Sequence, residues 1–253
     1  MESRYLLILP IAFACEFIDS SLGMGYGTTL TPFLLLLGFE PMQVVPAVLF
    51  SEFITGITAA FFHHTLKNVH FHRDSKDTRV AAILSLFTVI GTVAAVVLAV
   101  KLPANILKIW IGVIVLSMGI IIISTLNRVP RFSWIRISIV GAIASFNKGM
   151  SGGGYGPLVM GGQILSGVGV KNAVGITSLS EGITCLVGLL LYFIIGTNVD
   201  WTLAPWLMAG AVLSVPFAAY AVRRMSEKKV KFAVAVVVLI LGCLTLAKAV
   251  LRL

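Results

Sequence analysis

Two glycine-rich segments interrupt this very apolar chain and constrain its fold more than any other feature. Each contains the sequence Gly-x-Gly-Tyr-Gly, at 23–27 and again at 152–156. One charged residue precedes each motif, Asp19 in the first segment and Lys148 in the second. Irregular backbone at membrane depth is tolerated only where it is buried in protein or lines a cavity. Two such breaks at corresponding positions therefore point to a binding site of the kind found in transporters.

The two motifs belong to an internal repeat with an offset of 129 residues, the separation of Gly23 from Gly152. The offset holds without a gap from Glu16 to Ala59, and 12 of those 44 positions are identical. Apolar composition alone would match scattered leucines and valines. It would not also match Ser-Glu-x-Ile-Thr, which occurs at 51–55 and 180–184. The sequence thus predicts repeats at 5–126 and 134–251.

The composition requires a membrane environment, because 58% of the residues are hydrophobic, 11% are charged and the mean hydropathy is +1.02. Long apolar runs separated by short charged loops predict an all-α polytopic membrane protein with a single domain, 1–253. The segments at 5–38 and 134–166 are too long for one spanning helix, so we expect each to form two shorter pieces. Spanning helices are expected at 43–63, 79–101, 105–126, 171–195, 202–223 and 229–251.

Lysine and arginine are concentrated in three loops, at 64–79, 128–136 and 223–231. The loop at 196–201 contains neither residue. The positive-inside rule places the three basic loops in the cytoplasm of a multi-pass protein of the cell membrane. The repeats are then inverted, each with a broken, re-entrant pair of short helices followed by three transmembrane helices. This loop pattern also explains the net charge of +9 without nucleic-acid binding.

The glycine breaks are the first candidates for substrate binding. A helix N-terminus presents unpaired N–H groups and a partial positive charge, which attract anions. Short helices starting near Thr28 and Pro157 would point their first turns at the breaks. The alternative is that the glycines permit close helix packing. The predicted substrate-binding residues are Gly23, Gly25, Tyr26, Gly27, Thr28, Asn147, Lys148, Gly152, Gly153, Gly154, Tyr155 and Gly156, with Ser51, Ser180, Thr55 and Thr184 as hydrogen-bond donors.

Charged residues inside the apolar segments are the candidates for coupling or gating. Glu52 and Glu181 lie nine or ten residues into their predicted helices, near mid-membrane. Such a carboxyl group must be neutral, paired or exposed to a wet cavity, so it either carries a proton or cross-links helices. Asp19 and Lys148 occupy equivalent repeat positions. They either form an ion pair, or Lys148 contacts the substrate while Asp19 serves the coupling ion.

We expect no metal site, no cofactor and no enzymatic activity. The four histidines, His63, His64, His70 and His72, cluster at one helix end without a cysteine. The three cysteines lie singly in apolar segments. No paired His-Glu, Ser-His or Asp-Asp signature has a spacing that would support catalysis.

At the glycine breaks the sequence resembles the TauE/SafE family of sulfite-exporter-like membrane proteins. That family has duplicated glycine-rich segments, each followed by a proline and a short apolar helix. The corresponding stretches are Gly23–Leu35, with its proline at Pro32, and Ser151–Leu158, with its proline at Pro157. The resemblance covers essentially the whole chain. It implies transport of sulfite, sulfoacetate or related organosulfur anions, coupled to an ion gradient.

The resulting hypothesis is a secondary transporter of sulfite or small organosulfur anions, coupled to protons or other ions and working by alternating access. Two alternatives stay open, a cation or metal transporter that uses the intramembrane carboxylates and a passive anion channel. The expected partners are a small anionic substrate and the lipid bilayer. A homodimer is compatible with the sequence.

Overall fold

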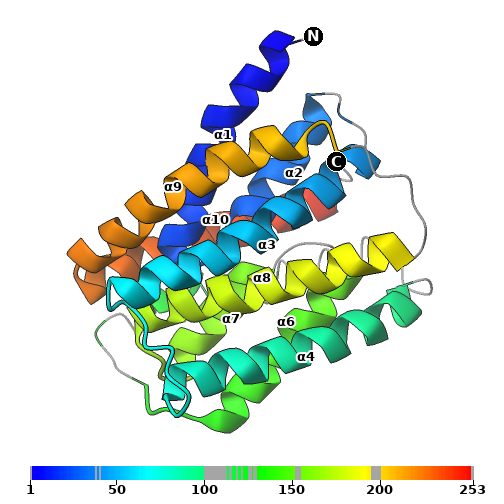
Figure 1. The fold of residues 1–253 in the computed structure, drawn as a ribbon. Helices are drawn as coiled ribbons and strands as arrows, with labels where there is room; N and C mark the ends of the chain where they lie inside the picture. The colour runs from blue at the N-terminus through cyan, green and yellow to red at the C-terminus, as the bar shows by residue number, and fades with distance from the viewer. Residues whose placement is uncertain are drawn as a thin grey trace.

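The computed structural model describes residues 2–37, 39, 41–99, 113, 116, 117, 119, 120, 122–124, 127, 130–151, 155–194 and 201–251. Every regular element among them is an α-helix (Figure 1). The bounds are α1 Glu2–Leu22, α2 Tyr26–Leu36, α3 Pro41–Thr65, α4 Lys76–Ala99, α6 Trp134–Ser151, α7 Tyr155–Leu165, α8 Val170–Ile194, α9 Ala204–Arg224 and α10 Glu227–Leu251.

The first long segment is two helices, as predicted, because glycine conformations end α1. Gly23 has φ +71° and Gly25 has φ +132°, values that L side chains rarely adopt. The chain leaves α1 after Leu22 and begins α2 at Tyr26. In the second segment α6 ends at Ser151, and α7 starts at Tyr155 rather than at the predicted Pro157.

Helices α3 and α8 form the centre of the bundle and run antiparallel (Figure 1). Three glycine contacts show their direction. Gly188 lies against Leu49, Gly56 against Gly182, and Gly175 against His63. Residue numbers therefore rise along α3 as they fall along α8. The closest approach is at Gly56, where an added methyl group would stand 2.6 Å from the carbonyl oxygen of Ser178.

Two helix pairs flank this centre, α1 with α9 on one side and α4 with α6 on the other (Figure 1). Gly210 of α9 packs against Leu9 of α1, and Gly141 of α6 packs against Leu84 of α4. The hydrophobic core is correspondingly divided. One buried cluster joins α1, α2 and α3 with α9, and the other joins α6, α7, α8 and α10 with α4. Each broken pair is thus packed against a helix from the other half of the chain.

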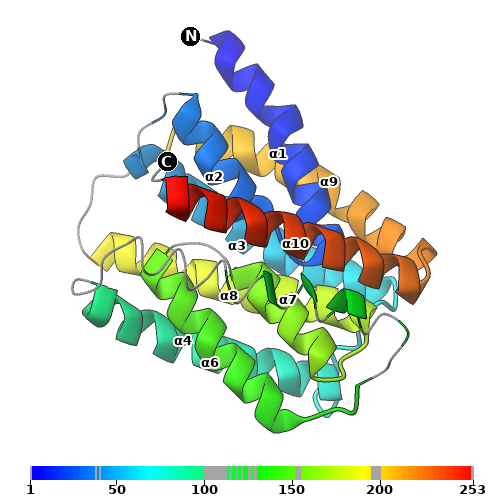
Figure 2. The same ribbon diagram turned by 180° about the vertical axis from the view of Figure 1, so that it is seen from behind.

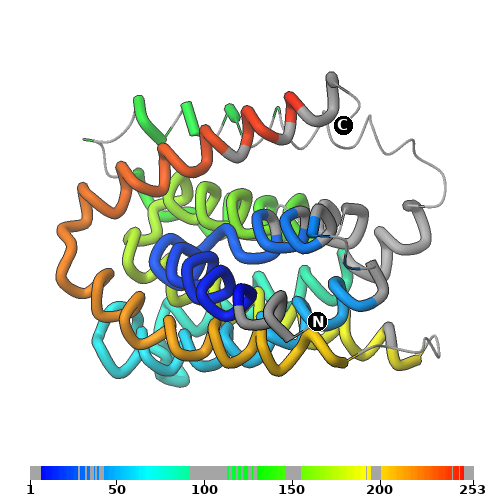
Figure 3. The backbone as a smooth tube through the Cα atoms, turned by 90° about the horizontal axis from the view of Figure 1, so that it is seen from above, coloured from blue at the N-terminus to red at the C-terminus, as the bar shows by residue number. Residues whose placement is uncertain are grey.

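Helix α10 crosses the back of the molecule (Figure 2). The described residues between 113 and 124 lie along its side (Figure 3). Leu116 contacts Gly242, and Gly119 contacts Leu239. The two contacts are reciprocal, because residues 116 and 239 and residues 119 and 242 are both separated by 123 positions. Contacts paired in this way are those of two antiparallel segments, so the residues from 116 to 119 run opposite to α10.

The three basic loops gather at one end of the bundle. The side chain of Lys171 donates to the carbonyl of Arg223 at 3.0 Å, and Asn172 donates to the carboxylate of Asp77 at 2.7 Å. The ammonium of Lys76 stands 3.4 Å from the centre of the Phe132 ring. These contacts join the start of α4 to the segment before α6 and to the start of α8, and they join the start of α8 to the end of α9.

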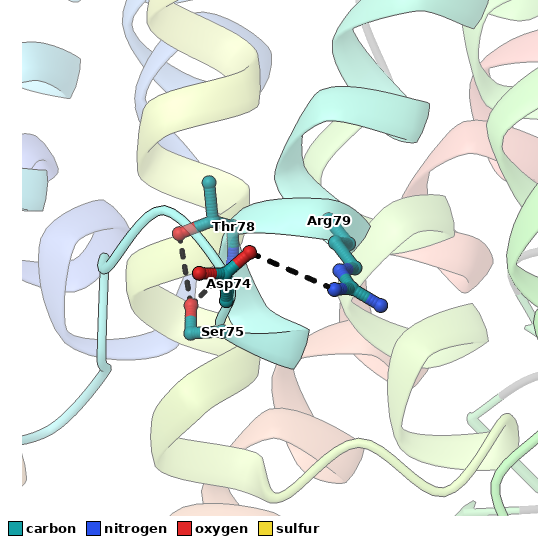
Figure 4. A network of polar contacts seen from close by, with 4 residues as sticks. All are labelled: Asp74, Ser75, Thr78 and Arg79. Atoms are coloured by element: carbon teal, nitrogen blue, oxygen red, sulfur yellow. Dashed lines mark hydrogen bonds and ion pairs between the residues drawn. The ribbon is translucent and has the colours of Figure 1, made fainter.

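Helix α4 is capped at this end by a small polar network (Figure 4). The Ser75 hydroxyl accepts the backbone N–H of Thr78 at 3.1 Å, the arrangement of a helix N-cap. Asp74 and Arg79 stand 4.0 Å apart, and both are largely exposed. An exposed ion pair of this kind contributes little stability. The network fixes where α4 begins.

The sides of the bundle are apolar and suit contact with lipid. Large hydrophobic side chains are exposed on eight of the described helices, and examples are Phe61, Leu86, Ile135, Leu190 and Phe217. Among the described residues, three helical stretches are long and apolar enough to cross a membrane, Gln43–Thr65, Val170–Leu191 and Ala204–Arg224. A contiguous apolar surface of this kind would be an aggregation hazard in water.

Candidate functional site

A small cavity lies where α1, α3 and α8 meet, beside the first glycine break. It has room for about one water molecule. Four carboxyl groups line it, and each belongs to a buried residue. The lining residues are Glu16, Asp19, Glu52, Thr55, Gly56, Ser178 and Glu181. Three of the four carboxylates are those that the sequence singled out for coupling, and Glu16 is an addition.

The chain's own carboxylates occupy the N-terminus of α2. The backbone N–H of Tyr26 donates to Asp19 Oδ1 at 3.0 Å, and that of Gly27 donates to Glu52 Oε1 at 2.9 Å. Helix N-termini attract negative charge through these unpaired N–H groups. The glycine at position 27 is needed here, since a methyl group would stand 2.9 Å from the Glu52 carboxylate. The first break therefore binds anionic groups, and in this structure they come from the protein.

Glu16 is held between two hydroxyl groups. Ser20 donates to its Oε1 at 2.5 Å, and Thr55 donates to its Oε2 at 3.1 Å. Sequence reasoning missed Glu16 because its repeat counterpart is Ser145, so the residue is not part of the matched pattern. The spacing contains a usable signal. Glu16, Asp19 and Ser20 are three and four residues apart, which places them on one face of α1.

The second half of the molecule has a hydroxyl cluster in the equivalent place. Thr88 of α4 is its centre, with hydrogen bonds to Tyr155 at 3.2 Å, Ser145 at 3.2 Å and Thr184 at 3.1 Å. The sequence predicted Tyr155 and Thr184, and it missed Thr88 and Ser145. Thr184 is the repeat counterpart of Thr55, which donates to Glu16 in the first half. The hydroxyl of Thr88 thus takes the place that the Glu16 carboxylate has in the first half.

The two predicted tyrosines of the motifs have corresponding partners. The Tyr26 hydroxyl is 2.9 Å from the Ser51 hydroxyl, and Tyr155 hydrogen-bonds to Ser180. Both tyrosines are buried. The structure therefore brings Tyr26, Ser51, Tyr155 and Ser180 together in matching pairs, one in each half. None of these four lines the cavity.

The two repeated glutamates have different surroundings. The Cys185 thiol donates to Glu52 Oε2 at 3.2 Å. The repeat counterpart of Cys185 is Gly56, and that of Glu52 is Glu181. Gly56 and Glu181 both line the cavity. The Cys185 thiol thus lies beside the Glu52 carboxylate, whereas its repeat counterpart Gly56 packs against the backbone of α8.

One of the four histidines belongs to the polar centre rather than to the loop. His63 is buried, and its Nε2 lies 2.8 Å from the carbonyl of Ser20. The Asn68 amide nitrogen lies 3.0 Å from His63 Nδ1. Since an amide N–H₂ only donates and a carbonyl only accepts, Nδ1 accepts and Nε2 carries the proton. His63 is therefore neutral. It connects the end of α3 to the α1 residue that holds Glu16.

The two glycine breaks meet in space. An added methyl group at Gly156 would stand 2.8 Å from Met24, and one at Gly23 would stand 3.2 Å from Met160 of α7. Gly25 is buried with the first break. Gly152, Gly153 and Gly154 lie outside the described residues, as do the side chains of Thr28, Asn147 and Lys148. The predicted ion pair of Asp19 with Lys148 falls on the same part of the chain.

Long apolar helices, an apolar lateral surface and a buried polar centre between broken helices define a polytopic membrane protein of the transporter class. The chain matches the family model for the sulfite exporter TauE/SafE over residues 8–245, and it belongs to that family. It is also 26% identical over 237 residues to the probable membrane transporter protein YtnM of Bacillus subtilis. That alignment covers 87% of this chain and 75% of the relative.

Proposed function

We propose that this membrane transporter moves sulfite or small organosulfur anions, such as sulfoacetate, across the cell membrane by proton-coupled alternating access. One observation carries the proposal. A cavity lined by four carboxyl groups lies beside the glycine breaks at the crossing of α3 and α8. Ionisable residues inside a membrane bundle are costly, and they mark transport and proton pathways. The name of the matched family supports sulfite as the first substrate to test.

The proposed motion relates two inverted repeats, 5–126 and 134–251. The antiparallel course of α3 and α8 supports this arrangement. The cavity holds about one water, whereas sulfite alone has four heavy atoms. We therefore assign the described conformation to a state closed to substrate, which opens as the halves move.

The two breaks have different tasks in this proposal. The N–H groups of Tyr26 and Gly27 already hold the carboxylates of Asp19 and Glu52, so the first break serves coupling. The anion is assigned to the second break, at Gly152–Gly154, with Lys148 as its positive partner. The three basic loops, which lie at one end of the bundle, face the cytoplasm in this arrangement.

The test is uptake into proteoliposomes of sulfite, sulfoacetate, thiosulfate and sulfate, with and without a pH gradient. We expect accumulation of at least one sulfur anion, stimulated by the gradient. Lys148→Ala should abolish it. Lys171→Ala is the matched control, because Lys171 binds the carbonyl of Arg223 at the end of the bundle. Transport of none of the four anions would overturn the substrate assignment.

A cation transporter is the second candidate, and the four carboxyl groups of the cavity favour it. Within the described residues, however, no three His, Cys, Asp or Glu side chains are placed to hold a metal ion. The same proteoliposomes distinguish the two functions. Flux of a cation in the absence of any sulfur anion would favour the cation transporter.

A further inference from the structure

The four carboxyl groups of the cavity differ in the chemistry of their hydrogen-bond partners. Glu52 accepts from the backbone N–H of Gly27, and Asp19 accepts from that of Tyr26. A backbone N–H can only donate, so it suits the ionised carboxylate, which only accepts. Protonation of these oxygens would leave two donors facing each other. Each of these contacts therefore needs the bonded oxygen as an acceptor, and it holds the start of α2 whether or not the other carboxyl oxygen carries a proton.

Glu16 has partners of another kind. Its two oxygens are bound by the hydroxyls of Ser20, at 2.5 Å, and Thr55, at 3.1 Å. A hydroxyl can donate or accept, because its hydrogen rotates about the C–O bond. Ser20 and Thr55 can donate to the carboxylate, and either can turn to accept from the carboxylic acid. No heavy atom has to move between the two states.

We infer that Glu16 is the group that takes up and releases the coupling proton during transport. This inference rests on the proposed proton-coupled function, and it names a residue that the repeat pattern did not. Protonation forms an O–H bond on one carboxyl oxygen, and the proton comes from and returns to water that reaches the cavity. Asp19 and Glu52 hold the first break in place through the backbone N–H groups of Tyr26 and Gly27.

Several other carboxyl groups act on Glu16, and their negative charge favours binding of one proton within the group. Negative groups act on it from its own helix through Asp19, from α3 through Glu52 and from α8 through Glu181. From α2 it faces the Tyr26 hydroxyl. The arginines of α9 lie in its last turn, and the charges of α10 that the structure describes lie between 227 and 231. Like charges at short range favour a proton on one member of such a group.

The hydroxyl cluster of the second half has no carboxyl group at the position of Glu16, so only the first half has this proton-binding residue. Ser145 is the repeat counterpart of Glu16, and it binds Thr88 with Thr184. These hydroxyls satisfy one another and change no charge at physiological pH. The proton step is thus confined to the first half.

The experiment compares pH-gradient-driven accumulation with exchange at equal pH on the two sides of the membrane, using labelled sulfite and sulfoacetate. Glu16→Gln keeps the size of the side chain and resembles the protonated form. It should lose gradient-driven accumulation down to the level of protein-free liposomes and retain exchange, which needs no net proton movement. Glu227→Gln, an exposed change at the start of α10, should behave as the wild type. Gradient-driven accumulation by Glu16→Gln would overturn the inference.

Two further measurements keep the test decisive. Thr55→Val removes a partner that can accept, and it should shift the pH dependence of accumulation, whereas Thr55→Ser should not. Infrared difference spectra of the purified protein between acid and neutral pH report the carboxylic acid C=O band without any substrate. The component of that band that belongs to Glu16 should be missing from the spectrum of Glu16→Gln and present in that of Glu52→Gln. If the wild type moves no sulfur anion, the proposed substrate is wrong. If the band of Glu16→Gln equals that of the wild type, the role of Glu16 is wrong.

Discussion

The two halves of the polar centre use the same repeat positions for different chemistry. In the first half the carboxylate of Glu16 accepts from Thr55, and in the second half the hydroxyl of Thr88 receives the hydrogen bond of Thr184. The tyrosine and serine pairs remain equivalent. The difference teaches that a duplicated segment can keep its backbone break and its scaffold hydrogen bonds while a carboxyl group of one copy, Glu16, is a serine hydroxyl, Ser145, in the other.

The largest loss of stability should come from a substitution at Gly56, the glycine at which α3 and α8 approach each other most closely. A methyl group at Gly56 would stand 2.6 Å from the backbone carbonyl of Ser178 and 2.8 Å from Gly182. Backbone cannot give way cheaply, so Gly56→Ala should lower the free energy of unfolding by about 3 kcal/mol. Gly188→Ala is the matched control on the same helix pair, because its methyl group would meet Leu49 at an ordinary 3.4 Å.

Thermal unfolding in detergent measures both variants. Equal melting temperatures for Gly56→Ala and Gly188→Ala would mean that α3 and α8 are not in close contact at Gly56. The contrast between Gly56 and its counterpart Cys185 would then have no basis.

A smaller loss of stability is expected when the Glu52 carboxylate, which accepts from the start of α2, is removed. Glu52→Ala removes the acceptor of the Gly27 N–H and of the Cys185 thiol. A hydrogen bond to a charged group contributes about 1.5–3 kcal/mol, so the loss should be about 2 kcal/mol. Limited proteolysis should show faster cleavage near residues 23–27, while the α3–α4 loop is cut at the unchanged rate. Unchanged cleavage at the first break would contradict the role of Glu52 as its anchor.

The smallest losses of stability are expected when the hydroxyl groups of Tyr26 and Tyr155 are removed, and their difference compares the two halves. Tyr26→Phe removes the hydroxyl that contacts Ser51, and Tyr155→Phe removes one of several hydroxyls around Thr88. Each change should cost about 1 kcal/mol or less. Tyr155→Phe should be the milder of the two, because Ser145 and Thr184 still bind Thr88. Denaturant unfolding measures both. A larger loss for Tyr155→Phe would reverse the proposed comparison.

Much of the fold could be predicted from the sequence because glycine and hydrophobicity act locally. The two breaks, the helices that follow them and the basic loops were placed within a few residues of their observed bounds. Helices α2 and α7 start at Tyr26 and Tyr155, two residues before the predicted starts at Thr28 and Pro157. Proline at the first helical position is a preference, and glycine conformation decided where α2 began.

The polar centre was only half predictable, because its chemistry depends on contacts between distant helices. The repeat pattern selected residues that both halves share, such as Glu52 and Glu181. Glu16 has Ser145 at the equivalent position, and Thr88 lies beyond the matched stretch from Glu16 to Ala59, so a search for identity passes over both. The partner that distinguishes Glu16 lies 39 residues away, and the partner of Thr88 lies 67 residues away. Residues that differ between two repeats and face the interior can therefore carry the chemistry that distinguishes the two halves.

Cys185 gives the molecule a built-in kinetic marker. Its thiol is fully buried beside Glu52, whereas the thiol of Cys243 is exposed on α10. A small alkylating reagent can reach Cys185 only while α3 and α8 are apart, so its modification counts opening events. The ratio of the two labelling rates within one molecule would then report how often the centre opens, whatever compound it carries.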